Sequence, residues 1–298
     1  MPEKSQEQTQ ASNRRFINRI LCPTNLSPSS DEALRYGVAI ARAYNAKLYL
    51  CYAAEDPQKL EPEQVNKLFL DSIAPYISVT DRPWINWEGI ITQGEATEVI
   101  PRLATEHQID LIVMRSRRRP YAAMLLGSAA EAVCHTATCP VLVTHQQERE
   151  WVDLAGDINL KRILVAYDFS EYSDLALSYG LSLAQEFQTE LHLMNVSPNS
   201  LENPSEETNL EKATKHLQEQ IPSDAHLWAK IIPVIATGKP YHQILDYAQE
   251  NSIDLICIGA RGTEDSAWAL FGSNADRVLR QASCPVLIAQ IAHIAKTS

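Results

Sequence analysis

The sequence lacks the features of several common protein classes. No apolar run approaches the ~20 residues of a membrane-spanning helix, so we expect no membrane partner. The six cysteines form no C-x-x-C pair and are too few for a disulfide framework in 298 residues, which indicates a reducing, cytoplasmic setting. Acidic residues outnumber basic ones, with a formal net charge of -11, so we expect no nucleic-acid partner.

Recognisable catalytic motifs are also missing. There is no Gly-Lys-Ser/Thr of a P-loop and no G-x-S-x-G elbow of a hydrolase. The eight histidines are scattered and form no metal-ligand spacing such as H-E-x-x-H. The sequence therefore indicates neither a catalytic nucleophile nor a metal site.

The chain consists of one unit written twice. Residues 20–27 match residues 163–170 at a shift of 143 (163 minus 20), and residues 139–142 match residues 284–287 at a shift of 145 (284 minus 139). Self-similarity of this kind predicts repeated structural units. We predict a disordered tail over residues 1–13, a first domain over 14–147, a linker over 148–158 and a second domain over 159–294.

Within each unit, strand-like apolar runs alternate with helical periodicity. After the run at residues 163–166, residues recur at the spacing of one helix face, namely Tyr172, Ala176, Tyr179, Leu183 and Phe187. This alternation predicts α/β domains, each an open, doubly wound parallel sheet with right-handed crossovers. Ligands bind such sheets beyond the carboxyl ends of the strands.

A glycine motif follows the apolar run at residues 253–258. It consists of Gly259-x-x-Gly262, nine residues, and Gly272-Ser273 at the expected start of a helix. Glycine has no Cβ, so the chain can turn sharply and a ligand can approach the backbone. The first N–H groups of a helix have no internal acceptor and lie at the positive end of its dipole. The motif therefore predicts an anion site that suits phosphate, with a purely structural turn as the alternative.

The spacing of these glycines, with the strand before them and the Ser-Cys-Pro-Val-Leu strand after them, resembles the nucleotide-binding signature of the universal stress protein family. The resemblance covers nearly the whole chain, twice. It implies two tandem five-stranded sheets of strand order 3-2-1-4-5, packed as a pseudo-dimer through their fifth strands, residues 140–144 against 285–289. The sequence leaves open whether two copies of the chain also form a homodimer. The implied ligand is an adenine nucleotide, ATP or else AMP or ADP, with or without Mg.

The resemblance also implies roles for individual residues of the second unit. Asp168 matches an aspartate that contacts the nucleoside, and Val196 matches a position whose backbone borders the adenine. The predicted nucleotide site, with Arg261 and Asn274 on its phosphate side, consists of Asp168, Val196, Gly259, Arg261, Gly262, Gly272, Ser273 and Asn274. For Asp168 the alternative is helix capping, because Asp-x-Ser before a helix is also an ordinary N-cap pattern.

The first unit departs from this signature. Its counterparts of Asp168, Gly259 and Gly262 are Asn25, Arg115 and Arg118. We expect this site to be lost or altered, because arginine adopts positive-φ conformations only with strain of roughly 1 kcal/mol or more and its side chain would occupy ligand space. Two interpretations of the basic run Arg115 to Arg119 stay open. It is either a solvated loop or a set of planar guanidinium groups that bind another anion.

The sequence favours a stress-response protein in which an adenine nucleotide acts as a conformational or assembly ligand. In the absence of a P-loop lysine or an evident general base, at most slow ATP hydrolysis is expected. One alternative is a partner-binding scaffold with a vestigial site, since one copy has lost the signature. The other is a slow ATP hydrolase.

Overall fold

The structure is a computed structural model of the chain. It describes residues 17–26, 28–54, 62–77, 85–116, 127–144, 149–197, 206–263 and 271–290. The predicted tail over residues 1–13 lies outside the described residues, as do Arg117, Arg118 and Arg119.

Strands and helices alternate along both halves of the chain. The first half contains β1 (Arg19–Pro23), α2 (Pro28–Tyr44), β2 (Lys47–Ala54), α3 (Pro62–Ile77), β3 (Trp87–Gln93), α4 (Ala96–Glu106), β4 (Leu111–Arg115), α5 (Ser128–Thr136) and β5 (Val141–Thr144). The second half contains β6 (Arg162–Ala166), α6 (Glu171–Phe187), β7 (Glu190–Ser197), α7 (Glu206–Gln218), the 3-10 turn η2 (Ala225–Leu227), β8 (Lys230–Thr237), α8 (Pro240–Glu250), β9 (Leu255–Gly259), α9 (Ser273–Gln281) and β10 (Val286–Ala289).

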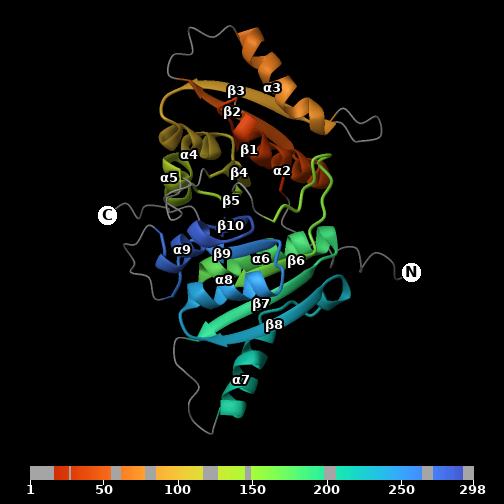
Figure 1. Ribbon diagram of the computed structural model, residues 1–298, viewed down its shortest axis with the longest axis vertical. Helices are drawn as coiled ribbons and strands as arrows, with labels where there is room; N and C mark the ends of the chain where they lie inside the picture. The colour runs from red at the N-terminus through yellow and green to blue at the C-terminus, as the bar shows by residue number, and fades with distance from the viewer. Residues whose placement is uncertain are drawn as a thin grey trace, which may run out of the picture.

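The strands form one ten-stranded sheet in the order β3-β2-β1-β4-β5-β10-β9-β6-β7-β8 (Figure 1). Each half therefore has the predicted order 3-2-1-4-5, which confirms the fold class. Within each half the pairs are parallel, whereas β5 and β10 pair antiparallel, with Val143 opposite Val286. The predicted pairing through the fifth strands is confirmed, and it joins the two sheets into one.

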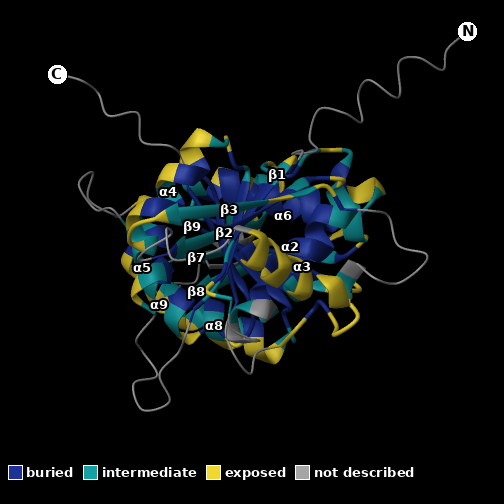
Figure 2. Ribbon diagram, turned by 90° about the horizontal axis from the view of Figure 1, so that it is seen from above, coloured by how far each residue is buried: buried dark blue, intermediate teal, exposed yellow. Residues whose placement is uncertain are grey.

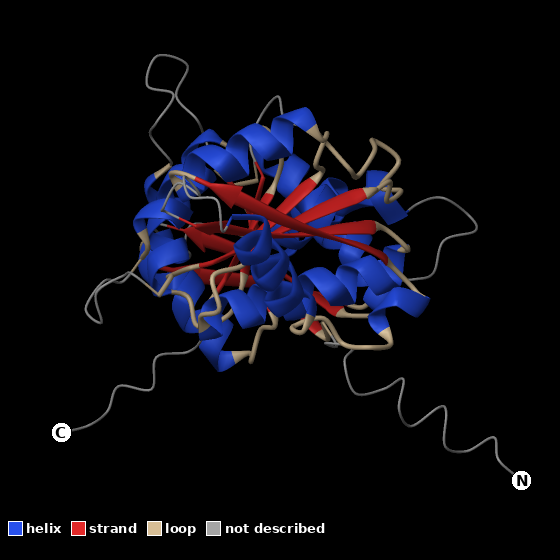
Figure 3. Cartoon of the chain, turned by 90° about the horizontal axis from the view of Figure 1, so that it is seen from below, coloured by secondary structure: helices blue, strands red, loops and turns tan. Residues whose placement is uncertain are grey.

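Helices cover both faces of this sheet (Figure 3). Side chains of α2, α3, α6 and α7 belong to one hydrophobic core, and those of α4, α5, α8 and α9 belong to the other. Successive strand residues alternate between these cores, as Ile20 and Leu21 do. Because both faces are covered, the central strands β4, β5, β9 and β10 are apolar runs that are buried along almost their whole length. The outer strand β3 is mostly of intermediate burial (Figure 2). No helix in the described part of the chain is long and apolar enough to cross a membrane.

The duplication extends to unusual backbone conformations. Left-handed residues recur at matching places in the two halves, at shifts of 143 or 144. The pairs are Leu26 and Phe169, Asn45 and Gln188, Gly94 and Gly238, and Gln108 and Ser252. Side chains differ at most of these positions, so the shared backbone comes from the fold common to both units.

The segment between the halves, predicted only as a linker, has a defined structure from residue 149 onward. Val152 and Ile158 form an antiparallel bridge. Trp151, only 1% exposed, packs edge-on against Tyr36 of α2 with ring centroids 4.8 Å apart, and its backbone N–H donates to the Tyr36 hydroxyl. The sequence analysis missed this because a lone tryptophan in a polar stretch has no periodicity that indicates burial.

We predict that Trp151→Ala lowers the free energy of unfolding by about 3–5 kcal/mol, because it leaves a cavity in a packed core. Leu154→Ala in the same segment is the matched control. Leu154 is 84% exposed, so its removal should change stability by no more than about 0.5 kcal/mol. Chemical denaturation followed by circular dichroism measures both, and equal stabilities would contradict the packing role of this segment.

Candidate functional site

A cavity of about 470 Å³ lies at the carboxyl ends of β6, β7 and β9 in the second half. Its volume falls within the range of roughly 300–1,000 Å³ typical of small-molecule sites. The eight residues predicted from the sequence all line it: Asp168, Val196, Gly259, Arg261, Gly262, Gly272, Ser273 and Asn274. The structure thus brings together residues that span more than 100 positions of the chain.

The start of α9 supplies the polar side of this cavity. Gly272 is the N-cap residue and provides no side-chain cap for the helix. Its own N–H donates to the carbonyl of Ala260 at 2.7 Å, which ties the helix start to the end of β9. The N–H groups of Ser273 and Asn274 follow at the positive end of the helix, where no carbonyl of the same helix can accept from them. This arrangement suits an anion.

Gly259 does not have the positive φ that the sequence analysis expected, and it has a packing role that was not predicted. The left-handed glycines among the described residues are Gly94, Gly156 and Gly238, so the positive-φ argument for Gly259 and Gly262 is wrong. Glycine is needed at position 259 for close packing, because a Cβ there would lie 2.8 Å from the Cβ of Tyr172. The end of β9 therefore fits directly against the first turn of α6.

Asp168 connects the two loops that border the cavity. One carboxylate oxygen accepts from the N–H of Ser170 at 3.2 Å and from its hydroxyl at 2.6 Å, and the other accepts from the N–H of Thr263 at 2.9 Å. The N-cap of α6 is Ser170, whose hydroxyl accepts from the N–H of Ser173. Asp168 is therefore not itself the cap. A carboxylate has about four acceptor positions, so one remains for a ligand.

Two aromatic residues beside Asp168 also line the cavity and were missed in the sequence analysis. Tyr167 donates its hydroxyl to Asp174, and burial, assisted by that bond, raises the pKa of Tyr167. Phe169 has a φ of 63° and stacks on His216 of α7, with ring centroids 4.4 Å apart and planes 9° from parallel. Their position next to a strand-end aspartate is the signal that could have identified them.

Apolar side chains form another part of the cavity lining, here called the apolar wall. Met194 and Val196 come from β7, Ile244 from α8 and Ile258 from β9. Apolar side chains and uncapped backbone N–H groups in one cavity suit a ligand with a flat ring at one end and an anion at the other. The arrangement can bind such a molecule.

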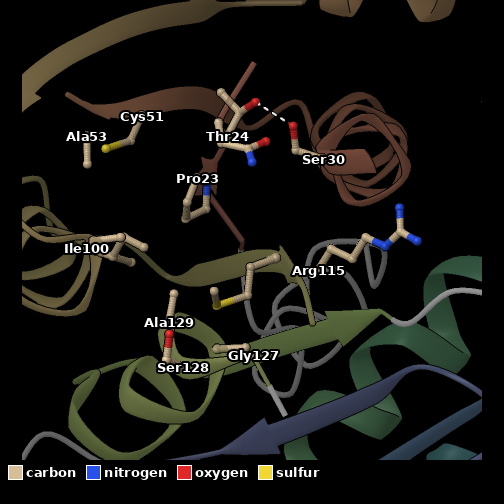
Figure 4. A pocket seen from close by; sticks show the side chains of 14 residues that line it. Pro23, Thr24, Ser30, Cys51, Ala53, Ile100, Arg115, Gly127, Ser128 and Ala129 are labelled. Carbon is tan, nitrogen blue, oxygen red and sulfur yellow. Dashed lines mark hydrogen bonds between the residues drawn. The ribbon is translucent and has the colours of Figure 1, made fainter. Parts of the chain in front are cut away.

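The first half has a smaller cavity of about 310 Å³ at the matching place (Figure 4). Gly127 is the N-cap of α5 there and, like Gly272, provides no side-chain cap. Arg115 does not fill the cavity as expected, because its guanidinium forms an ion pair with Glu32 at 3.2 Å and points away from Ile100 and Ala129 in Figure 4. Burial raises the pKa of Glu32, and Arg115 acts in the opposite direction.

We searched the described part of the chain for groups that could bind a metal ion and for reactive thiols. It contains no group of three or more His, Cys, Asp or Glu residues that could hold a metal ion. All six cysteines are free and buried. Cys51 lines the first cavity, but burial raises its pKa to about 12, so it stays a thiol at neutral pH.

Comparison with known proteins gives matches to both halves. A model of the universal stress protein family matches residues 17–145 and again residues 159–290. Universal stress protein YxiE of Bacillus subtilis is 29% identical over 143 residues, which cover 43% of this chain and 97% of that protein. Universal stress protein MJ0531 of Methanocaldococcus jannaschii is 30% identical over 144 residues, which cover 45% of this chain and 84% of that protein.

A solved structure matches both halves together. A universal stress protein from Archaeoglobus fulgidus is 24% identical, with a TM-score of 0.67 over 93% of this chain and 99% of that one. At this identity the likeness shows the fold alone. The two family matches cover most of the sequence, and each falls on five strands in the order 3-2-1-4-5. The chain therefore belongs to the universal stress protein family, as a member with two family domains in tandem.

Proposed function

We propose that this protein is a cytoplasmic adenine-nucleotide-binding protein and that its ligand, ATP or else ADP or AMP, binds in the second-half cavity. The observation that supports this most is the start of α9, where Gly272 leaves the first helical N–H groups without a side-chain cap at the border of the cavity. The phosphates bind there. The base lies against the apolar wall that includes Val196 and Ile258.

Bound nucleotide acts as a conformational or assembly ligand. A molecule that binds the folded form alone stabilises that form by RT ln(1 + [L]/Kd), which is about 2.7 kcal/mol at a concentration of 100 Kd. Asp168 is placed to report occupancy, because it already joins the loops after β6 and β9 through Ser170 and Thr263. A ligand that shares this carboxylate binds to the same group that joins Ser170 to Thr263.

Magnesium binding depends on the nucleotide. Among the described residues lining the cavity, Asp168 is the one carboxylate. Mg²⁺ commonly binds one or two protein carboxylates together with substrate phosphates, so the phosphates would supply most of its ligands here.

A partner-binding scaffold is the second candidate function. The observation that favours it is the first half, which keeps its fold and a cavity of about 310 Å³ although Asn25 and Arg115 replace the signature residues. In this case the first half presents a surface and the second half alone binds the ligand. A homodimer of the whole chain is compatible with either function.

We predict that Gly272→Asp lowers ATP affinity by about tenfold to a hundredfold. The new carboxylate caps the N–H groups that phosphates need, and each hydrogen bond to a charged group contributes roughly 1.5–3 kcal/mol. The backbone at Gly272 (φ -76°, ψ 145°) suits an aspartate N-cap. Stability should therefore change by only a few tenths of a kcal/mol. Titration calorimetry measures affinity, and thermal unfolding measures stability.

Gly127→Asp is the matched control for this variant. Gly127 caps α5 with φ -65° and ψ 139°, so the same substitution adds the same carboxylate to the corresponding helix of the first half. Its ATP affinity should equal that of the wild type. If Gly272→Asp binds ATP normally, or if Gly127→Asp loses binding instead, the assignment of the site is wrong.

We also predict that ATP turnover is well below the ~10 s⁻¹ typical of enzymes. The cavity lining, as far as the structure describes it, contains no lysine or histidine, and the carboxylate of Asp168 already accepts from Ser170 and Thr263. Phosphate release with and without Mg²⁺ is the measurement. A magnesium-dependent rate near 10 s⁻¹ that Asp168→Asn abolishes would establish a catalyst instead of a binding protein.

A further inference from the structure

The residue that leads into helix α9 contacts the first half of the chain. The ring of Phe271, the residue before the N-cap Gly272, stacks on the ring of His135 in α5. The ring centroids lie 4.7 Å apart and the planes are 22° from parallel. A residue of the first half therefore touches the chain segment that leads into the proposed phosphate site.

A second contact holds the other end of the same helix. Arg280, in the last turn of α9, lies 2.9 Å from the carboxylate of Glu131 in α5. It also pairs with Asp276 one turn earlier in α9. The side chains of Arg280 and Glu131 are 15% and 37% exposed, so solvent screens this ion pair in part. Helix α5 thus contacts both ends of α9.

The two helices are counterparts in the duplicated fold, yet their contacts are not equivalent. Gly272 corresponds to Gly127 (272 minus 127 is 145), and Arg280 corresponds to His135 (280 minus 135 is 145). An arginine in one copy thus stands where the other copy has the ring that meets Phe271. The pairing of β5 with β10 places these helices near each other.

We propose that His135 is a positioning residue for the nucleotide site of the opposite half. No first-half residue is among the described residues that line the second cavity. His135 acts through Phe271, because the stacked rings hold the chain where Gly272 donates to Ala260 at 2.7 Å. The proposal rests on the function proposed above.

The physical basis is the steep geometry of hydrogen bonds. An N–H donor loses most of its interaction when its distance or angle departs from the narrow preferred range. The N–H groups of Ser273 and Asn274 follow Gly272 directly, so any shift of the helix start moves them relative to a bound phosphate. Glu131 limits rotation of α9 from its far end through Arg280. The first half, with its altered signature, thereby contributes to a site that it does not line.

The first test uses the intact, ligand-free protein. We expect His135→Ala to accelerate amide hydrogen exchange at Gly272, whose N–H donates to Ala260, and at Asp276, whose N–H donates to Gly272, with exchange in β9 and β10 unchanged. His135→Phe keeps a ring for stacking and should restore the slow exchange. His107→Ala is the matched control, because His107 also contacts an aromatic ring, Tyr49 at 4.9 Å, but lies in α4's C-cap, outside α5 and α9.

The second test is ATP titration of the same proteins. The interaction energy of an aromatic pair corresponds to a change in affinity of about two- to tenfold. His135→Ala should therefore bind ATP about two- to tenfold more weakly than the wild type. His135→Phe and His107→Ala should match the wild type. Glu131→Gln, which removes the ion pair at the other end of α9, should also weaken binding without changing the cavity lining.

The outcomes separate this proposal from the function on which it rests. If the wild type binds no ATP, the proposed function fails, and the exchange data alone then decide whether His135 positions α9. If the wild type binds ATP and His135→Ala alters neither exchange nor affinity, the positioning role is overturned. Faster exchange with unchanged affinity also overturns it, because the contact would then be packing without influence on the site. The positioning role is also overturned if His135→Ala weakens ATP binding and His135→Phe binds ATP as weakly as His135→Ala does.

Discussion

The antiparallel pairing of β5 with β10 is the constraint on which the rest of the structure depends. Each strand is only four residues long, and Val141 to Val143 and Val286 to Ile288 are buried almost completely. Alone, each half would expose this apolar strand as a sheet edge, which invites pairing with other chains. Their mutual pairing removes both edges, makes one continuous sheet and brings α5 and α9 together.

The same constraint explains how the two copies can differ in chemistry while they keep one fold. The strands, the helices and even the left-handed residues recur in both halves. The strand ends do not: β9 ends at Gly259, packed against Tyr172, whereas β4 ends at Arg115, paired with Glu32. Since the halves are joined in one sheet, the first can depart from the signature and still cover the edge strand of the second.

The sequence predicted most of the fold because its signals are local and repeated. Apolar runs, helical spacing and the shift of 143 to 145 residues indicated the strands, the helices and the duplication, and the family resemblance supplied the strand order. The glycine spacing identified residues that the structure brings to one cavity. The positive-φ argument for Gly259 was wrong, and its close packing against Tyr172 was not predicted because that contact arises between distant segments.

Side-chain contacts between elements far apart in the sequence could not be predicted from local patterns. The burial of Trp151 against Tyr36, the ion pair of Arg115 with Glu32 and the stacking of His135 on Phe271 all join elements far apart in sequence. No periodicity encodes such contacts. Asp168 is an intermediate case, since its place at a strand end was evident, but its bond to Thr263 depends on the neighbouring strand.

The central claim is that one half of the duplicated fold binds nucleotide and the other does not. Amide hydrogen exchange of the intact chain with saturating ATP tests it most directly, because the two corresponding helix starts are compared within one molecule. The account predicts protection at Ser273 and Asn274, and none at Ser128 and Ala129. Equal protection at both helix starts, or protection confined to the first half, would contradict it.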